Sequence, residues 1–70
     1  MYFVFELQKT ANGQCALLPY HDDAWTYQQA ESVYHAKCSA AAISEIPVHT
    51  VILADVEGAV YATKTWRREA

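Results

Sequence analysis

The stretch Pro47-Val48-His49-Thr50-Val51-Ile52-Leu53-Ala54-Asp55 carries no Lys, Arg, Asp or Glu before its last residue. β-branched and other apolar side chains dominate it, which is typical of a strand. Alternation would place Val48, Thr50, Ile52 and Ala54 on one face and His49, Val51 and Leu53 on the other. Because neither face carries a full charge, we expect a central strand that is covered on both sides.

A helix is predicted before this strand. Thr26 and Gln29 form a capping-box pattern, which places the start of the helix near them. Small and apolar residues then recur at helical spacing, at Ala30, Val33, Tyr34, Cys38, Ala41 and Ala42. Lys37 interrupts this stripe, and its long side chain is expected to reach solvent from the edge. Pro47 cannot continue a helix, so the break falls between Ser44 and Pro47.

The remaining segments predict two hairpins. Val56-Glu57-Gly58 is a tight turn, with Gly58 in the left-handed conformation, and Ala59 to Trp66 returns as the last strand. At the N-terminus, Met1 to Lys9 alternates as a strand, Asn12-Gly13 turns the chain, and Gln14 to Leu18 pairs back until Pro19 ends it. The order is β-β-α-β-β. We therefore expect a single α+β domain over residues 1–70, a four-stranded antiparallel sheet with one helix packed on one face.

Composition favours self-association. The chain has 70 residues, of which 53% are hydrophobic and only 19% are charged. One helix shields one face of a four-stranded sheet, so some apolar strand residues must stay outside it. We expect that the following side chains do not all fit beneath the helix: Tyr2, Val4, Val51, Leu53, Tyr61 and Trp66. A homo-oligomer built through the open sheet face or through edge strands would cover the surplus.

Charge and hydropathy exclude several classes of protein. The net charge is −3, and only Arg67-Arg68, with Lys64 nearby, is locally basic, which argues against binding to a nucleic-acid backbone. No apolar run approaches the roughly 20 residues of a membrane helix. The first residues lack the basic region of a signal peptide, so we expect a cytoplasmic protein. In that reducing compartment Cys15 and Cys38 are expected to be free, buried thiols.

Catalytic and metal sites are weakly supported. His35 and Cys38 lie three residues apart on the helix, but no short-spaced pair such as C-x2-C occurs, so Cys38 is interpreted as a core residue and no metal is expected. Ser44, His49 and Glu45 could be assembled as a nucleophile with its base, yet Ser44 is better explained as a residue that bonds the helix end. With only two glycines there is no phosphate-binding loop. We expect neither an enzyme nor a cofactor.

A binding role remains. Several aromatic residues offer flat faces with polar tips, namely Tyr20, Trp25, Tyr27, Tyr34, Tyr61 and Trp66. His35 and His49 add hydrogen-bond donors, and Arg67 and Arg68 add charge suited to phosphate. Such a set could stack a base at a subunit interface. The alternative, which the residues alone favour, is that these aromatics join the subunits to each other.

The helix and the strand after it carry a family resemblance. Tyr34-His35, the run from Ala40 to Ser44, and Pro47-Val48-His49 follow the pattern Y-H-x5-A-A-x-S-x2-P-x-H, which Glu31 precedes. This resembles a family of small uncharacterised proteins from phages and prophages of gut Firmicutes, over about Gln29 to Trp66. The similar sequences have leucine at Cys38, which favours a core role there. The resemblance implies a phage setting and no biochemical activity.

In that setting, small oligomeric proteins include sponges that sequester nucleotide signals and inhibitors that bind defence enzymes. By this analogy Tyr34, His35, Ser44 and His49 are expected to contact a ligand or to hold its pocket, together with the cluster Trp66, Arg67 and Arg68. We therefore expect a non-catalytic homo-oligomer that captures a nucleotide-like small molecule or inhibits a host defence protein. The alternative is a virion or assembly accessory protein without a small-molecule ligand.

Overall fold

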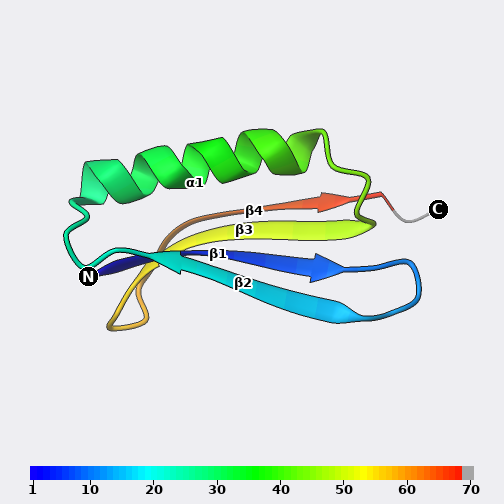
Figure 1. Ribbon diagram of the computed structural model, residues 1–70, viewed down its shortest axis with the longest axis horizontal. Helices are drawn as coiled ribbons and strands as arrows, with labels where there is room; N and C mark the ends of the chain where they lie inside the picture. The colour runs from blue at the N-terminus through cyan, green and yellow to red at the C-terminus, as the bar shows by residue number, and fades with distance from the viewer. Residues whose placement is uncertain (69–70) are drawn as a thin grey trace.

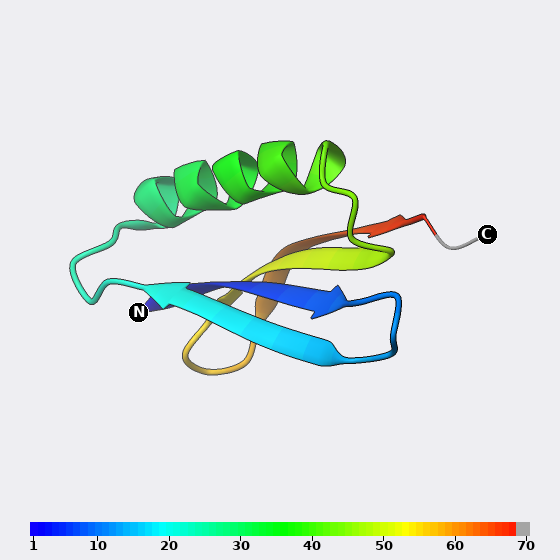
Figure 2. The same ribbon diagram turned by 45° about the vertical axis from the view of Figure 1, so that its right-hand side comes forward.

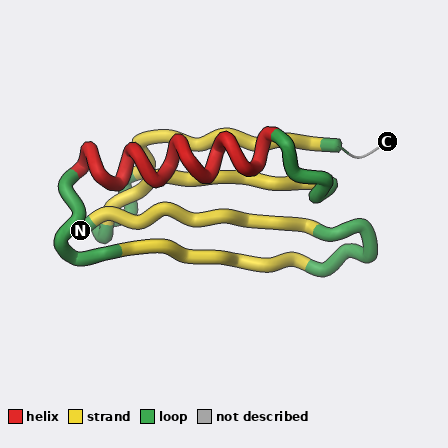
Figure 3. The backbone as a smooth tube through the Cα atoms, turned by 45° about the horizontal axis from the view of Figure 1, so that its top comes forward, coloured by secondary structure: helices red, strands yellow, loops and turns green. Residues whose placement is uncertain are grey.

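The computed structural model describes residues 1–68, which form one helix and four strands. Their bounds are β1 Tyr2–Lys9, β2 Cys15–His21, α1 Tyr27–Ala42, β3 Val48–Asp55 and β4 Val60–Arg67. All neighbouring strands pair antiparallel in the order β2-β1-β3-β4, and α1 lies across one face of the sheet (Figures 1 and 3). The predicted two-layer α+β fold is confirmed.

The ends of α1 follow from local chemistry. The Thr26 hydroxyl accepts from the backbone N–H of Gln29, while the Gln29 side chain accepts from the backbone N–H of Thr26, so the predicted capping box is present. These two bonds satisfy two of the backbone donors that every helix start leaves open. The helix ends at Ala42, two residues before the predicted break, and Ile43 caps it.

The core lies between α1 and the two central strands. Val4, Val51 and Leu53 are fully buried beneath the helix, which contributes the buried residues Ala30, Tyr34 and Ala41. Val33 and Cys38 pack against this core as predicted, whereas Ala42 is exposed. Ala30 and Ala41 let the helix approach the sheet closely at these two positions, because only a methyl group projects from each toward the core.

The prediction that Pro19 ends the second strand was wrong. β2 continues through Pro19 to His21. The N–H of Thr10 donates to the carbonyl of Gln14, and the antiparallel register pairs Gln8 with Ala16 and Glu6 with Leu18. Backbone groups alternate in direction along a strand, so those of Pro19 face the free edge of the sheet. Proline is tolerated there because the N–H that it lacks has no strand to bond.

The prediction that β3 is covered on both sides was also wrong. His49, Val51 and Leu53 are buried under α1, but Thr50 and Ile52 on the opposite face stay partly exposed. The chain has only one helix, and that helix occupies the first face (Figure 1).

Of the six side chains that were not expected to fit together beneath the helix, Tyr61 does remain 47% exposed, whereas the other five are accommodated on the helix side. Val4, Val51 and Leu53 fit completely under the helix. Tyr2 and Trp66 pack against the same core, and Tyr61 reaches the helix side through its ring contacts with Tyr2 and Tyr27. The opposite face exposes a further set of apolar residues, among them Leu7 and Leu17. The alternation was correct, but which face the helix covers is not encoded in the strand pattern.

Candidate functional site

The sheet face opposite α1 is covered by no other helix or strand of residues 1–68 (Figure 1). Directly opposed residues of an antiparallel sheet share a face, so the register defines four rows across β2, β1, β3 and β4. The rows are His21-Phe3-Ala54-Val60, Pro19-Phe5-Ile52-Thr63, Leu17-Leu7-Thr50-Thr65 and Cys15-Lys9-Val48-Arg67. We call these residues the open face. Its two middle rows contain no charged residue.

Large apolar side chains of the open face are accessible to solvent. Leu17 is 57% exposed and Leu7 is 41% exposed. The Phe3 and Phe5 rings stack with their centroids 5.7 Å apart. The hydroxyls of Thr50 and Thr65 bond each other at 2.9 Å, which satisfies their polar groups within the face. A continuous apolar patch of this kind usually marks an interaction surface.

Charges lie only at the two ends of the open face. Lys9 and Arg67 stand in the row at one end, which we call the basic end. Asp22, Asp23 and Glu57 are exposed in the segments that leave β2 and β3 at the other end, which we call the acidic end. The middle of the face is thus neutral, one end carries Lys9 and Arg67, and at the other end Glu57 is the acidic residue of the turn that bends away from α1 (Figures 1 and 2).

A buried polar network lies on the other face, under α1. Glu6 accepts from the Tyr20 hydroxyl at 2.7 Å through Oε2, and its Oε1 lies 2.8 Å from Nε2 of His49. A carboxylate oxygen only accepts, so Nε2 of His49 carries the proton of this bond. The hydrogen bond to Glu6 raises the pKa of the Tyr20 hydroxyl above its ordinary value, and partial burial of the ring adds to the shift. The Lys37 ammonium lies over the Tyr20 ring, 3.9 Å from its centroid.

The Glu6–His49 pair of this network is buried, whereas Tyr20 at its edge is partly exposed. His49 is 3% exposed and Glu6 is 6% exposed, and Nδ1 of His49 has no hydrogen-bond partner. A substrate cannot reach these groups while the core is closed, so the geometry favours a structural role that joins β1, β2 and β3. Sequence reasoning missed Glu6. The signal was present, because Glu6 shares the parity of Tyr2 and Val4 in β1 and therefore falls on the face that packs against the core.

The structure does not gather the predicted ligand residues of the helix into one pocket. Tyr34 points into the core, and its neighbour His35 is exposed on the outer side of α1. The Ser44 hydroxyl accepts from the backbone N–H of Ile46 in the loop after α1, and it is the backbone N–H of Ser44 that bonds the helix end, at the carbonyl of Ala41. His49 is buried in the network described above.

The predicted cluster at the C-terminal end of β4 is divided between the two faces. Trp66 is half-buried and packs against the core. Arg67 lies on the open face, opposite Val48. Arg68 donates to the carbonyl oxygens of Ala41, Ala42 and Ile46 at 2.6 to 3.2 Å, so its guanidinium caps the C-terminal end of α1.

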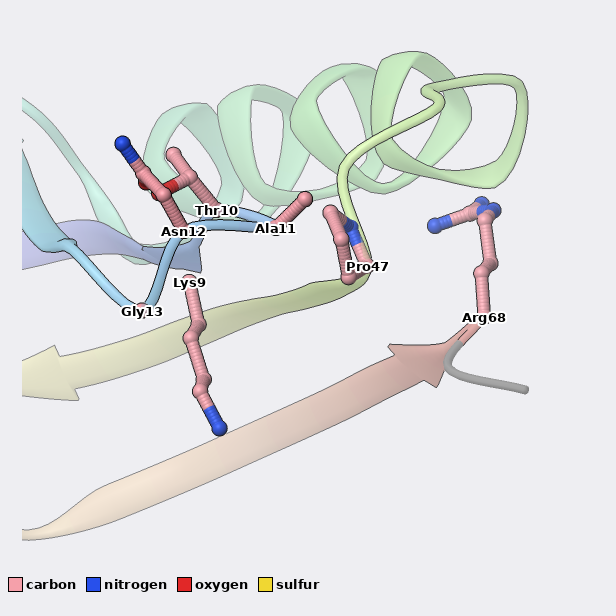
Figure 4. A pocket seen from close by; sticks show the side chains of 7 residues that line it. All are labelled: Lys9, Thr10, Ala11, Asn12, Gly13, Pro47 and Arg68. Carbon is pink, nitrogen blue, oxygen red and sulfur yellow. The ribbon is translucent and has the colours of Figure 1, made fainter.

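A shallow hollow of about 630 Å³ lies beside Arg68 at this end of the molecule. Its lining residues are Lys9, Thr10, Ala11, Asn12, Gly13, Pro47 and Arg68 (Figure 4). The Lys9 side chain extends away from the helix, whereas the Arg68 guanidinium turns toward the end of α1 (Figure 4). The two cations diverge, so they do not form a clamp for a phosphate.

Thiols and metal-ligand residues are dispersed. Cys15 and Cys38 are both free, and Cys15 is exposed, which corrects the prediction that it is buried. Cys15 is the first residue of the edge strand β2, and its side chain lies on the open face. Within residues 1–68 no group of three His, Cys, Asp or Glu side chains could hold a metal ion. In the same residues no helix is long and apolar enough to cross a membrane.

Two tyrosines, Tyr34 and Tyr61, have raised pKa values. Burial, followed by a hydrogen bond with Cys38, raises the pKa of Tyr34 to about 12. Tyr61 donates to Oδ2 of Asp55 at 2.6 Å, which raises the pKa of Tyr61 to about 12 and lowers that of Asp55. Backbone N–H groups of Glu57 and Ala59 also donate to Asp55, so this carboxylate fixes the β3–β4 turn.

These pKa values predict a pH dependence. Because both folded-state pKa values lie above the ordinary value of about 10, the stabilisation by Tyr34 and Tyr61 is complete below pH ~10 and is lost as the pH rises toward 12. The absorbance of the phenolate band in the near ultraviolet, followed against pH in the folded protein, reports the ionisation of each tyrosine. We expect Tyr34→Phe to remove one ionisation with a pKa of about 12, and Tyr61→Phe to remove another. Loss of an ordinary step near pH 10 in either variant would contradict the assignment.

No family model, curated protein or solved structure matches this chain.

Proposed function

We propose that the protein is a non-catalytic binding protein that works as a homo-oligomer assembled through the open face. The observation that carries this proposal is the neutral apolar centre of that face, with Leu17 and Leu7 accessible beside Phe5 and Ile52. The polar residues best suited to acid–base chemistry, Glu6 and His49, are instead enclosed in the core.

The free energy of burying apolar surface favours self-association through the open face. Burial of apolar surface stabilises by about 25 cal/mol per Å², so a few hundred Å² of open face is worth several kcal/mol. That is comparable with the whole stability of a small domain, which amounts to ~0.05–0.15 kcal/mol per residue. A chain that covers this surface with a copy of itself gains stability and avoids nonspecific aggregation.

A single charge on the open face should dissociate the oligomer. Leu17→Lys places an ammonium where an apolar surface is expected to close, and desolvation of an unpaired charge is costly. We expect the dissociation constant to rise at least about a hundredfold, equivalent to about 2.8 kcal/mol. Size-exclusion chromatography with light scattering measures this against the chain mass of 7.9 kDa.

The matched control is Ile43→Lys. Ile43 is 86% exposed at the end of α1, away from the open face, so the same change of residue should leave the mass unaltered. A wild-type chain that remains monomeric at micromolar concentration would refute the proposed assembly.

The proposed ligand is either a nucleotide-like small molecule or a host defence protein, in the cytoplasm of a phage-infected bacterium. Support for this setting comes from the pattern of Tyr34-His35, Ser44 and Pro47-Val48-His49. The separation of these side chains in the fold favours a protein partner over a small molecule.

Isothermal titration with cyclic and linear nucleotides, including ADP-ribose derivatives, separates these two ligands. We expect no heat of binding with any of these nucleotides, and that result would leave a host defence protein as the ligand. A saturable heat that disappears in Arg67→Ala would favour the nucleotide instead. Recovery of the protein at stoichiometric abundance in purified phage particles would favour the virion-accessory alternative.

A further inference from the structure

We propose that a second copy of the chain covers the open face with a two-fold axis that runs across the strands. Each strand then lies over its own counterpart, in the opposite direction. This inference rests on the proposed assembly and adds its geometry. Two packed sheets keep their strand directions within about 30° of each other, so the two-fold axis has two simple choices, across the strands or along them.

The charges at the ends of the open face distinguish these choices. An axis along the strands would bring the basic end, with Lys9 and Arg67, against the basic end of the other copy. An axis across the strands brings that end against the end that carries Glu57, in the turn that bends toward the open face (Figures 1 and 2). Complementary charges set the register of an interface even where they add little affinity. The self-complementary pattern therefore selects the axis across the strands.

The β3–β4 turn adds a specific contact. This turn bends away from α1, toward the side of the open face (Figures 1 and 2). Three hydrogen bonds to the side chain of Asp55, from Tyr61 and from the backbone of Glu57 and Ala59, fix its shape. Glu57 at its tip is placed to meet Arg67 of the second copy, because both belong to the β3–β4 hairpin.

The size of the face suits a dimer. Four strands of about eight residues, with a rise of ~3.3 Å and a spacing of ~4.8 Å, span about 25 by 19 Å. The flat area of this rectangle is about 500 Å². The accessible surface is larger, because it follows the contours of the side chains, and it therefore approaches the ~600–1,000 Å² per partner of specific interfaces. The centre is neutral, and its threonines Thr50 and Thr65 already bond each other.

Pairing through the free edge of β2 is the weaker alternative. The backbone groups of Cys15, Leu17, Pro19 and His21 face outward there, and Pro19 offers no N–H. An interrupted edge of this kind discourages strand addition. It would also leave Phe3, Phe5 and Ile52 uncovered.

Cysteine cross-linking tests the axis. In a Cys15→Ser/Cys38→Ala background, Leu17→Cys and Lys9→Cys each provide one thiol on the open face. With sheets ~10 Å apart and a rise of ~3.3 Å, the axis across the strands puts the two residues 17 about 12 Å apart and the two residues 9 about 22 Å apart. The axis along the strands reverses the order, to about 17 Å and about 11 Å.

We expect a short bismaleimide to cross-link the Leu17→Cys variant several times faster than the Lys9→Cys variant, with the background protein unreacted. Faster cross-linking of Lys9→Cys would overturn the axis and leave the proposed oligomer intact. Light scattering that shows only monomers would overturn both.

Charge reversal provides a test that keeps both native cysteines. Glu57→Lys and Arg67→Glu should each raise the dissociation constant several-fold at low salt, and the double variant should return it toward the wild-type value. Glu45→Lys, in the loop between α1 and β3, is the control with the same change of charge. Additive weakening in the double variant would contradict the contact between Glu57 and Arg67.

Discussion

Replacement of His49 by leucine should lower the free energy of unfolding by about 3 kcal/mol, because it leaves a buried carboxylate without its principal partner. Glu6 is 6% exposed and is bonded at 2.8 Å to His49 and at 2.7 Å to Tyr20. Solvent cannot replace the lost bond while the core stays closed, so screening by water is small. Urea-induced unfolding followed by far-ultraviolet circular dichroism measures the change.

The double variant Glu6→Leu/His49→Leu separates the cost of the orphaned charge from that of altered packing. Exchange of a buried polar pair for apolar residues of similar volume is often neutral or stabilising, so stability should recover most of the lost ~3 kcal/mol. The hydroxyl of Tyr20 is half-buried and can turn to water when Glu6 is gone. If both variants lose the same stability, packing and not charge pairing explains the effect.

Leu53→Ala should be destabilising by about 3–4 kcal/mol, because it deletes buried methyl groups and leaves a cavity. Leu53 is 1% exposed and is among the largest fully buried side chains, between Val4 of β1 and Ala62 of β4. A domain of this length has only about 4–10 kcal/mol in total, so the variant should be close to unfolding. Thermal and urea unfolding measure it, and Leu53→Val provides a milder deletion if Leu53→Ala does not fold.

Leu17→Ala is the matched control for this prediction. It deletes the same atoms from a side chain that is 57% exposed in the single chain. At dilutions where the chain is monomeric its cost should stay below about 0.5 kcal/mol. A cost that rises with protein concentration would place Leu17 in the oligomer interface, because the stability of a dimer depends on the concentration of its subunits.

Much of the fold was predictable because its determinants are local. The capping box of Thr26 and Gln29, the helix break before Pro47 and the positive φ of Gly58 each depend on residues within one turn of chain. Alternation in β1 and β3 predicted two distinct faces for each strand. Pro19 was misread because its effect depends on which edge of the strand is free, and the sheet order decides that.

The site was less predictable. Tyr34, His35 and Ser44 lie close together in sequence, but the helix turns them in different directions. Glu6 and His49 are far apart in sequence, and only the pairing of β1 with β3 brings them within 2.8 Å. An uncovered apolar sheet face was predicted from the sequence, but Phe3, Phe5 and Leu7 were not predicted to be part of it.

The sequence by itself determined that this protein has four strands, one capped helix and more apolar strand surface than that helix can cover, because these properties follow from periodicity and composition. Only the tertiary structure decided that Val4 and Leu53 are covered while Phe5 and Leu17 are not, and that the charges of Lys9 and Arg67 gather at one end. The physical reason is that both faces of β1 and β3 are apolar enough to receive the helix. The choice depends on the packing of the whole sheet against Ala30, Tyr34 and Ala41.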